Sequence, residues 1–184
     1  VTKEIADKLG TSITPVREAL LRLVSAGALH ATPAQAFLVP EVSLERYNEV
    51  NAIRKELECM AVAAACEQMS DERIATLRTL SDNFHDAMSN GEVERALHAN
   101  RAFRFTLYHY ADMPTLMALI EQLWVRIGPC FNCLYDPEIV LPCRSYRYDE
   151  LLTALEQGDT EASRAAIDKV IDEANAILIK QFLP

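Results

Sequence analysis

The 184-residue sequence has no long apolar run, and only five of its residues are glycine. Its longest mildly apolar run, Met60 to Cys66, is short and rich in alanine, whereas a membrane-spanning helix needs roughly 18 consecutive apolar residues. The start of the chain also lacks the charged, apolar and cleavage regions of a signal peptide in their usual order. These absences predict a cytoplasmic protein with no membrane partner.

The chain also lacks a basic excess, because its formal net charge is −9. The distribution of charge matters more than its sum, and residues 1–40 carry no acidic excess. The acidic surplus therefore lies beyond residue 40. This distribution permits DNA binding by the first 40 residues and argues against nucleic-acid binding by the rest of the chain.

Residues 2–9 have apolar side chains at positions 5, 6 and 9, which is the spacing of one helix face. Thr2 is suited to cap this helix, and Gly10 is suited to end it in a left-handed conformation. A second helix is predicted to start near Thr14 and Pro15, where proline loses no hydrogen bond, and to end at Gly27. Two helices joined by a short glycine-containing turn form a helix-turn-helix unit.

The segment 28–40 favours two short strands around a turn, which is typical of the wing of a winged helix. After a linker at about 39–44 the pattern is helical, with short connections that favour an antiparallel bundle. The sequence therefore predicts a mostly α fold, with a winged helix-turn-helix over residues 1–40 and a bundle of about six helices over residues 44–184. The bundle helices are expected at 44–68, 71–90, 92–111, 114–134, 144–157 and 160–182.

The stretch TKEIADKLGTSITPVREALLRLVSAG at residues 2–27 resembles the DNA-binding module of the GntR family of bacterial regulators, whose most specific signature is TPVREAL. The stretches IRKELECMAVAAA, AFRFTLYHYADMPTL and ELLTALEQGDTEASRAAI resemble the opening, middle and last helices of the FadR-type (FCD) C-terminal domain. The resemblance covers almost the whole chain and places the first helix of the winged module before Val1. It implies a transcriptional regulator, a repressor, that binds double-stranded DNA as a homodimer and responds to a small molecule.

Four residues are the candidate DNA contacts. Ser12 and Thr14 lie at the N-terminus of the expected recognition helix, where side chains and backbone N–H groups meet base edges and phosphates. Arg17 lies one turn further on, within reach of guanine or phosphate, and Lys3 is suited to clamp the DNA backbone. The alternative is that Ser12 and Thr14 cap the helix and that Arg17 pairs with a surface acid.

Three positions depart from the family pattern. The family usually carries arginine where this chain has Ile13, and a basic residue and a glycine where it has Gln35 and Ala36. An arginine that reads a base contributes about 1–3 kcal/mol of discrimination. The operator preference of this chain is therefore expected to differ from that of its relatives.

The resemblance also implies a divalent-metal site, built in many FCD domains from an aspartate, a histidine four residues later and two further histidines. The corresponding positions in this chain are Asn100, Arg104, Tyr148 and Val170. A guanidinium does not ligate a cation, and no carboxylate or imidazole remains at the four positions. The sequence therefore predicts that this chain uses no metal cofactor.

The replacements point to a different ligand. Two arginines in a bundle interior need anions. We therefore expect the former metal cavity to bind a carboxylate- or phosphate-bearing metabolite, with Arg104 in the role of the metal. The alternative is that Arg104 pairs internally with Glu58 or Glu150 and closes the pocket. The residues expected to line the cavity are Arg54, Asn100, Arg104 and Tyr148.

Other chemistries are less well supported by the sequence. Cys130 and Cys133, with Cys143 nearby, form a pair suited to a thiol redox switch or to zinc binding. Structural zinc normally needs four ligands, however, and the plainer interpretation is that these cysteines are buried core thiols. No nucleophile with an oriented base occurs, so the chain is not expected to be an enzyme. The aromatic residues Phe103, Phe105, Tyr108 and Trp124 are expected to fill the core.

Overall fold

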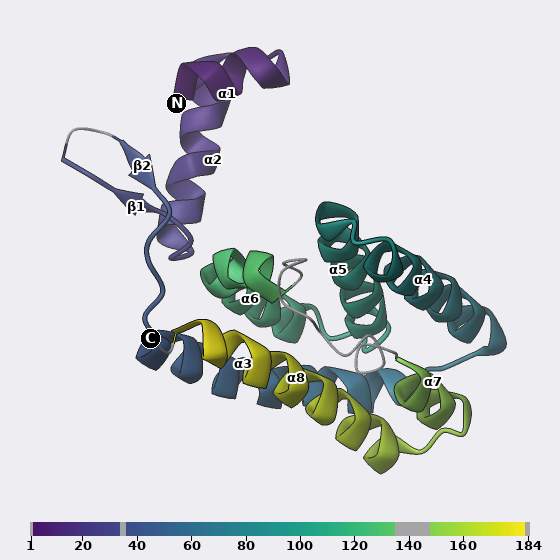
Figure 1. Ribbon diagram of the computed structural model, residues 1–184. Helices are drawn as coiled ribbons and strands as arrows, with labels where there is room; N and C mark the ends of the chain where they lie inside the picture. Colours follow the sequence, from purple (N-terminus) through teal and green to yellow (C-terminus); the bar gives the residue numbers. More distant parts are fainter. Residues whose placement is uncertain (1, 34–35, 135–147, 183–184) are drawn as a thin grey trace.

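The structure, a computed structural model, describes residues 2–33, 36–134 and 148–182 (Figure 1). We call residues 2–38 the head and residues 44–182 the bundle. The head contains α1 (Thr2–Leu9), α2 (Ile13–Ser25), β1 (His30–Ala31) and β2 (Phe37–Leu38). The bundle contains α3 (Leu44–Cys66), α4 (Asp71–Ser89), α5 (Val93–His109), α6 (Pro114–Leu134), α7 (Asp149–Glu156) and α8 (Thr160–Phe182).

The helix-turn-helix forms as the apolar spacing predicts, because α1 and α2 cross and bury Ala6 and Val16. Gly10 ends α1 with a φ of +63°, in the left-handed region that glycine tolerates. The predicted cap of the first helix was wrong, and the second helix begins one residue before its predicted start. Thr2 already lies inside α1, so it does not cap that helix, and α2 begins at Ile13. Pro15 therefore occupies the third helical position, where its missing N–H still costs no hydrogen bond.

The wing is a short antiparallel hairpin in which His30 pairs with Leu38 and Ala31 pairs with Phe37. The N–H of Thr32 donates to the Ala36 carbonyl at 2.9 Å and extends the pairing toward the turn. The strands are shorter than the sequence pattern suggested. The turn residue at position 35, where the chain departs from the family pattern, lies outside the described residues.

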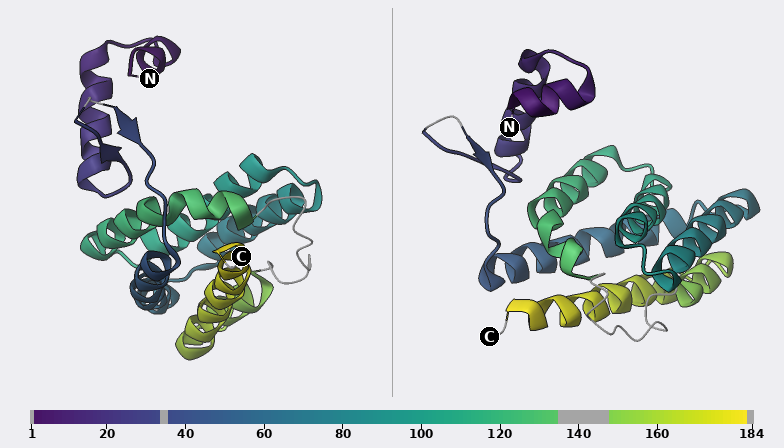
Figure 2. Two further views of the ribbon diagram at one scale, coloured as in Figure 1. Left: turned by 60° about the vertical axis from the view of Figure 1, so that its left-hand side comes forward. Right: turned by 45° about the horizontal axis from the view of Figure 1, so that its top comes forward.

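The bundle is organised around α3, which packs against α8, α6 and α5. The other close pairs are α4 with α5 and α7 with α8. Figure 2 shows the head standing to one side of the bundle, joined to it by residues 39–43, while α8 runs back along α3 toward the start of that helix. The central position of α3 means that its inward-facing side chains meet several helices.

The bundle helices begin and end close to their predicted limits, because serine, glycine and proline residues punctuate the sequence between them. The exception is the helix expected at 144–157, which begins at Asp149 with Tyr148 as its N-cap residue. Residues 144–147 lie outside the described part of the chain.

None of the helices in the described ranges has both the length and the apolar character that crossing a bilayer requires.

The N-cap serines provide a test of the local structure. Ser43 caps α3 by accepting a hydrogen bond from the Arg46 N–H at 3.2 Å, whereas Ser12, the N-cap residue of α2, makes no side-chain capping hydrogen bond. Ser43→Ala is therefore expected to lower the free energy of unfolding by about 1 kcal/mol, and Ser12→Ala by less than about 0.5 kcal/mol. Chemical denaturation followed by circular dichroism measures both. Equal losses in the two variants would contradict the capping assignment.

Candidate functional site

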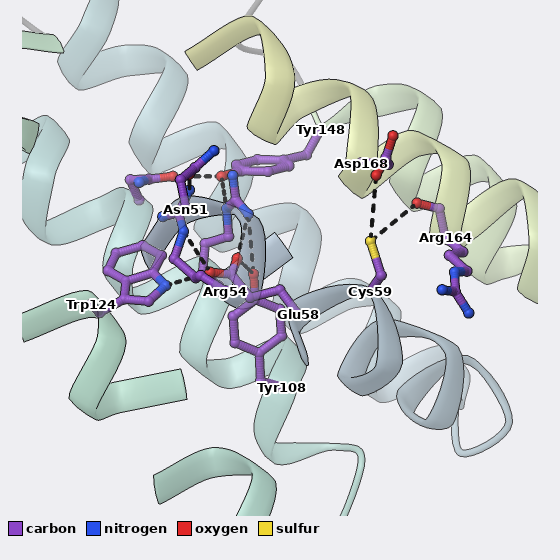
Figure 3. A network of polar contacts seen from close by, with 11 residues as sticks. Asn51, Arg54, Glu58, Cys59, Tyr108, Trp124, Tyr148, Arg164 and Asp168 are labelled. Atoms are coloured by element: carbon purple, nitrogen blue, oxygen red, sulfur yellow. Dashed lines mark hydrogen bonds and ion pairs between the residues drawn. The ribbon is translucent and has the colours of Figure 1, made fainter. Parts of the chain in front are cut away.

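A buried ionic cluster occupies the centre of the bundle (Figure 3). It begins on α3, where Asn51, Arg54 and Glu58 follow one another at spacings of three and four residues. This spacing places all three side chains on one face of the helix. All three are buried, and Glu58 is fully excluded from solvent. A carboxylate in such a position must be held by hydrogen bonds or by opposite charge.

The Glu58 carboxylate is held from three helices. Its Oε2 accepts hydrogen bonds from Arg104 Nη1 at 2.9 Å and from the Tyr108 hydroxyl, both on α5. Its Oε1 accepts a hydrogen bond from Trp124 Nε1 on α6 at 2.7 Å and lies 3.3 Å from Arg54 Nε. Both oxygens are therefore engaged, and the helices α3, α5 and α6 meet at one anion.

Arg104 extends the cluster toward α7. Its Nε donates to the Tyr148 hydroxyl at 2.9 Å, and its Nη1 also donates to the Tyr108 hydroxyl at 3.1 Å. The Tyr148 hydroxyl in turn donates to Asn100 Oδ1 at 2.5 Å. The Tyr148 ring stacks on Phe103 with centroids 3.8 Å apart, which fixes the hydroxyl in place.

Arg54 occupies the other side of the carboxylate. Its Nη2 donates to Asn51 Oδ1 at 2.9 Å, and its guanidinium lies over the rings of Trp124 and Phe131 at 5.6 and 5.3 Å from their centroids. Its Nε faces Glu58 but lacks the geometry of a hydrogen bond. The Arg54 guanidinium is thus buried with one of its donors unsatisfied.

The cluster carries one positive charge in excess among the described residues, because two guanidinium groups face a single carboxylate. Burial alone would lower the pKa of Arg104, but the Tyr108 and Tyr148 oxygens and the Glu58 carboxylate raise it above its ordinary value. Burial raises the pKa of Tyr108 and of Tyr148, so both hydroxyls stay protonated and neutral. The tyrosines therefore do not compensate the second arginine.

Of the residues that the sequence predicts to line a cavity, Arg54 and Arg104 contact the Glu58 carboxylate. Tyr148 and Asn100 belong to the same cluster through the chain of hydrogen bonds that begins at Arg104. The alternative of an internal ion pair is also present, because Arg104 pairs with Glu58. The other acid considered for that role, Glu150, instead pairs with Lys169 at 2.9 Å on the exterior.

The sequence argument missed one member of the cluster, Asn51, and identified two others only in part. Tyr108 and Trp124 were expected to be core fillers, but each also donates a hydrogen bond to Glu58. The pairing of Arg54 with Glu58 was missed as well. The spacing of four between those two residues was the available signal, since it suits an ion pair on one helix.

A divalent metal does not fit this donor set. The family's ligand positions hold the amide of Asn100, the guanidinium of Arg104, the hydroxyl of Tyr148 and the apolar Val170. The two arginines would repel a cation from the centre of the cluster. The described residues also contain no group of three histidine, cysteine, aspartate or glutamate side chains suited to hold a metal.

The start of α2 presents a separate polar surface. Ser12 has an extended backbone, with φ −80° and ψ 163°, and its side chain makes no capping hydrogen bond. Ser12, Thr14 and Arg17 are exposed on α2, and Lys3 is exposed on α1. Capping therefore does not occupy the Ser12 hydroxyl, although the sequence left that alternative open. The backbone N–H groups of the first turn of α2 have no partner within the helix.

The cysteines show no reactive site within the described part of the chain. Cys59, Cys66 and Cys130 are buried thiols that form no disulfide. Burial raises the pKa of the Cys59 thiol to about 11, which suppresses the reactive thiolate at neutral pH. Cys133 and Cys143, which complete the predicted redox or zinc group, have side chains outside the described residues.

An open cleft of about 430 Å³ lies elsewhere, between the start of α4 and the end of α7. Two of its three charged lining residues, Arg78 and Glu156, form an ion pair at 2.5 Å, and the third, Asp71, is acidic and does not favour an anionic ligand. None of the cluster residues lines it. The buried cluster, in which two arginines share one carboxylate among the described residues, is therefore the stronger candidate for an effector site.

Comparison with known proteins identifies the fold and its relatives. The family of bacterial regulatory proteins of gntR type matches residues 1–39, and the FCD domain matches residues 49–173. The chain is 45% identical to the HTH-type transcriptional regulator McbR of Escherichia coli K12, over 99% of this chain and 83% of that protein. The structure of E. coli McbR/YncC is similar with a TM-score of 0.91 at 44% identity, covering 100% of this chain and 87% of that one.

More distant relatives share the same architecture. The Nta operon transcriptional regulator of Aminobacter aminovorans is 31% identical over 67% of this chain and 59% of that protein. Streptococcus agalactiae GntR shares the fold with a TM-score of 0.58 at 16% identity, over 96% of this chain and 87% of that one. The chain belongs to the GntR family of DNA-binding bacterial transcription regulators, in the group that carries an FCD domain.

Proposed function

We propose that this regulator is a repressor whose bundle binds a small acidic metabolite at the Glu58 cluster and thereby changes how its head binds DNA. Residues 1–40 act as the DNA-binding domain, and residues 44–184 act as the effector-binding and dimerisation domain. The observation that carries the proposal is the presence of two buried guanidinium groups with one carboxylate between them.

The charge balance favours an anionic ligand. A buried charge that is only partly compensated is costly, and Arg54 and Arg104 share the single Glu58 carboxylate. A carboxylate or phosphate group that enters the cluster would supply a second anion for the two arginines. Arg54 has an unsatisfied Nε and lies beside Asn51, while Tyr148 and Asn100 supply hydrogen-bonding groups on the Arg104 side of the cluster. A ligand with one anionic group and one hydroxyl or carbonyl group suits this set.

The DNA contacts proposed are Lys3, Ser12, Thr14 and Arg17, together with the N–H groups that begin α2. Lys8, which the sequence argument did not single out, is a further exposed cation at the end of α1. The cations of the head bind phosphates, while Ser12 and Thr14 lie where a recognition helix meets base edges.

A homodimer completes the proposal, because two heads on a twofold axis match two half-sites of an operator. The bundle exposes large apolar side chains that a second copy is suited to cover. They are Ile53 and Met60 on α3 and Leu119 on α6, each about half exposed.

The DNA assignment is tested with a duplex selected from a random library by the full chain. Arg17→Ala is expected to weaken binding at least about fivefold, because a base or phosphate contact is lost. Lys3→Ala is expected to weaken binding to all duplexes alike and to lower the salt slope by about one. Fluorescence anisotropy at several salt concentrations measures both effects.

Arg46→Ala, which removes an exposed α3 cation, is the matched control. Unchanged affinity in both head variants would refute the assignment.

The effector site is tested by calorimetric titration with citrate, malate and glycerol phosphate. Arg104→Ala and the milder Tyr148→Phe are each expected to weaken the binding of whichever acid the wild type binds, Arg104→Ala by about tenfold or more. Arg101→Ala, three residues earlier on α5 with its side chain on the exterior, is the control. The proposal is overturned if the wild type binds none of the acids or if both variants bind as well as the wild type.

The role of Glu58 as internal counter-ion gives a stability prediction. Glu58→Gln leaves two buried guanidinium groups without a charge partner, so it is expected to lower the free energy of unfolding by about 3–5 kcal/mol. Glu56→Gln, on the exposed face of the same helix, is expected to cost less than about 0.5 kcal/mol. Urea denaturation compares the two variants. A similar small loss in both would mean that Glu58 does not balance the arginines.

A further inference from the structure

One hydrogen bond joins the bundle directly to the recognition helix. Arg126 Nε on α6 donates to the carbonyl oxygen of Ala26, the C-cap residue of α2, at 3.0 Å. The two residues are 100 positions apart in the chain, and the bond is partly buried. In Figure 1 the C-terminal end of α2 faces α6.

The end of α2 is built to leave this carbonyl available. Gly27 is left-handed with a φ of +78°, its N–H donates to the Val24 carbonyl, and the N–H of Ala28 donates to the Leu23 carbonyl. This Schellman arrangement satisfies the carbonyls one turn earlier. The Ala26 carbonyl points beyond them, at the negative end of the helix dipole, where a guanidinium is favoured.

Gly27 also lets the arginine approach closely. A Cβ atom at this position would lie 3.3 Å from Arg126 Nε and 3.6 Å from its Cγ, so the side chain packs against the bare backbone of the glycine. The guanidinium therefore fixes the end of α2 through charge, hydrogen bonding and close contact at the same place.

The opposite side of α6 touches the ionic cluster. Trp124 lies two residues before Arg126, and its Nε1 donates to Glu58 Oε1 at 2.7 Å. One short segment of a single helix thus holds the buried carboxylate on one face and the end of the recognition helix on another. A change at Glu58 that displaces the indole also displaces the backbone that carries Arg126.

We infer that Arg126 is a positioning residue that links the Glu58 cluster to the recognition helix. A change in the contacts of the Glu58 carboxylate changes the position of α2 through Arg126. The inference rests on the proposed function, since that function supplies the event that alters the cluster. The route runs from Glu58 through Trp124 and the α6 backbone to Arg126 and the Ala26 carbonyl. Residues 39–43 provide the competing covalent route from the bundle to the head.

The test is a double-mutant cycle on the full chain, with hydrogen exchange at residues 20–29 as the measurement. Arg126→Ala is expected to lower the protection of these amides about fivefold, and Trp124→Phe about threefold in the wild-type background. In the Arg126→Ala background Trp124→Phe is expected to change nothing at residues 20–29, because the connection is already absent. Arg126→Lys keeps a cation at the helix end and is expected to restore part of the protection.

Gln122→Ala, one turn earlier on the exposed side of α6, is the matched control and is expected to leave the head unchanged. If Trp124→Phe does not fold, Tyr108→Phe removes a different hydrogen bond to Glu58 and takes its place in the cycle. The inference is overturned if the cluster variant alters α2 equally with and without Arg126, or does not alter it at all. Neither DNA nor an organic acid is present in this cycle, so its failure is distinct from failure of the proposed effector site.

Discussion

The buried Glu58 carboxylate is the interaction on which the arrangement of the bundle depends. A charge that is fully removed from water is tolerated only when donors surround it, and here the donors come from α3, α5 and α6. Each donor must keep its distance and direction, so the three helices are constrained relative to one another at one point. Apolar contacts tolerate small shifts of a helix, whereas a multidentate carboxylate does not. The relative positions of α3, α5 and α6 are therefore closely fixed at the centre of the bundle.

Much of the architecture followed from local chemistry. Glycine, proline and serine residues between amphipathic stretches mark the helix ends, which explains why most limits were predicted within a few residues. The sequence also grouped Arg54, Asn100, Arg104 and Tyr148, which the structure brings into one cluster, whereas their role in binding an effector stays a prediction. The hydrogen bonds of Tyr108 and Trp124 were not foreseen, because they depend on the distances between helices, which no pattern within one helix encodes. The start of α2 was predicted only to within one residue, because Pro15 is compatible with several positions in a first turn.

An arginine and a metal ion hold an anionic ligand in different ways. A metal ion is exchangeable, and its affinity depends on the protonation of its ligands. The Arg104 guanidinium is attached to the chain, and its raised pKa keeps it charged throughout the physiological range. A planar guanidinium also directs its donors in one plane, so it distinguishes carboxylates by orientation more sharply than a spherical ion. In this chain part of that capacity is already used by Glu58 and Tyr148.

The separation of charge between head and bundle affects the orientation in which such a protein approaches DNA. The acidic surplus lies beyond residue 40, and the cations of α1 and α2 are exposed on the head. Phosphates repel the acidic bundle and attract the head, so the electric field of a duplex turns the approaching molecule before contact. Collisions that begin in the wrong orientation are thereby corrected within about a Debye length, roughly 8 Å at physiological ionic strength. The acidic surface thus favours approaches in which the head meets the duplex first.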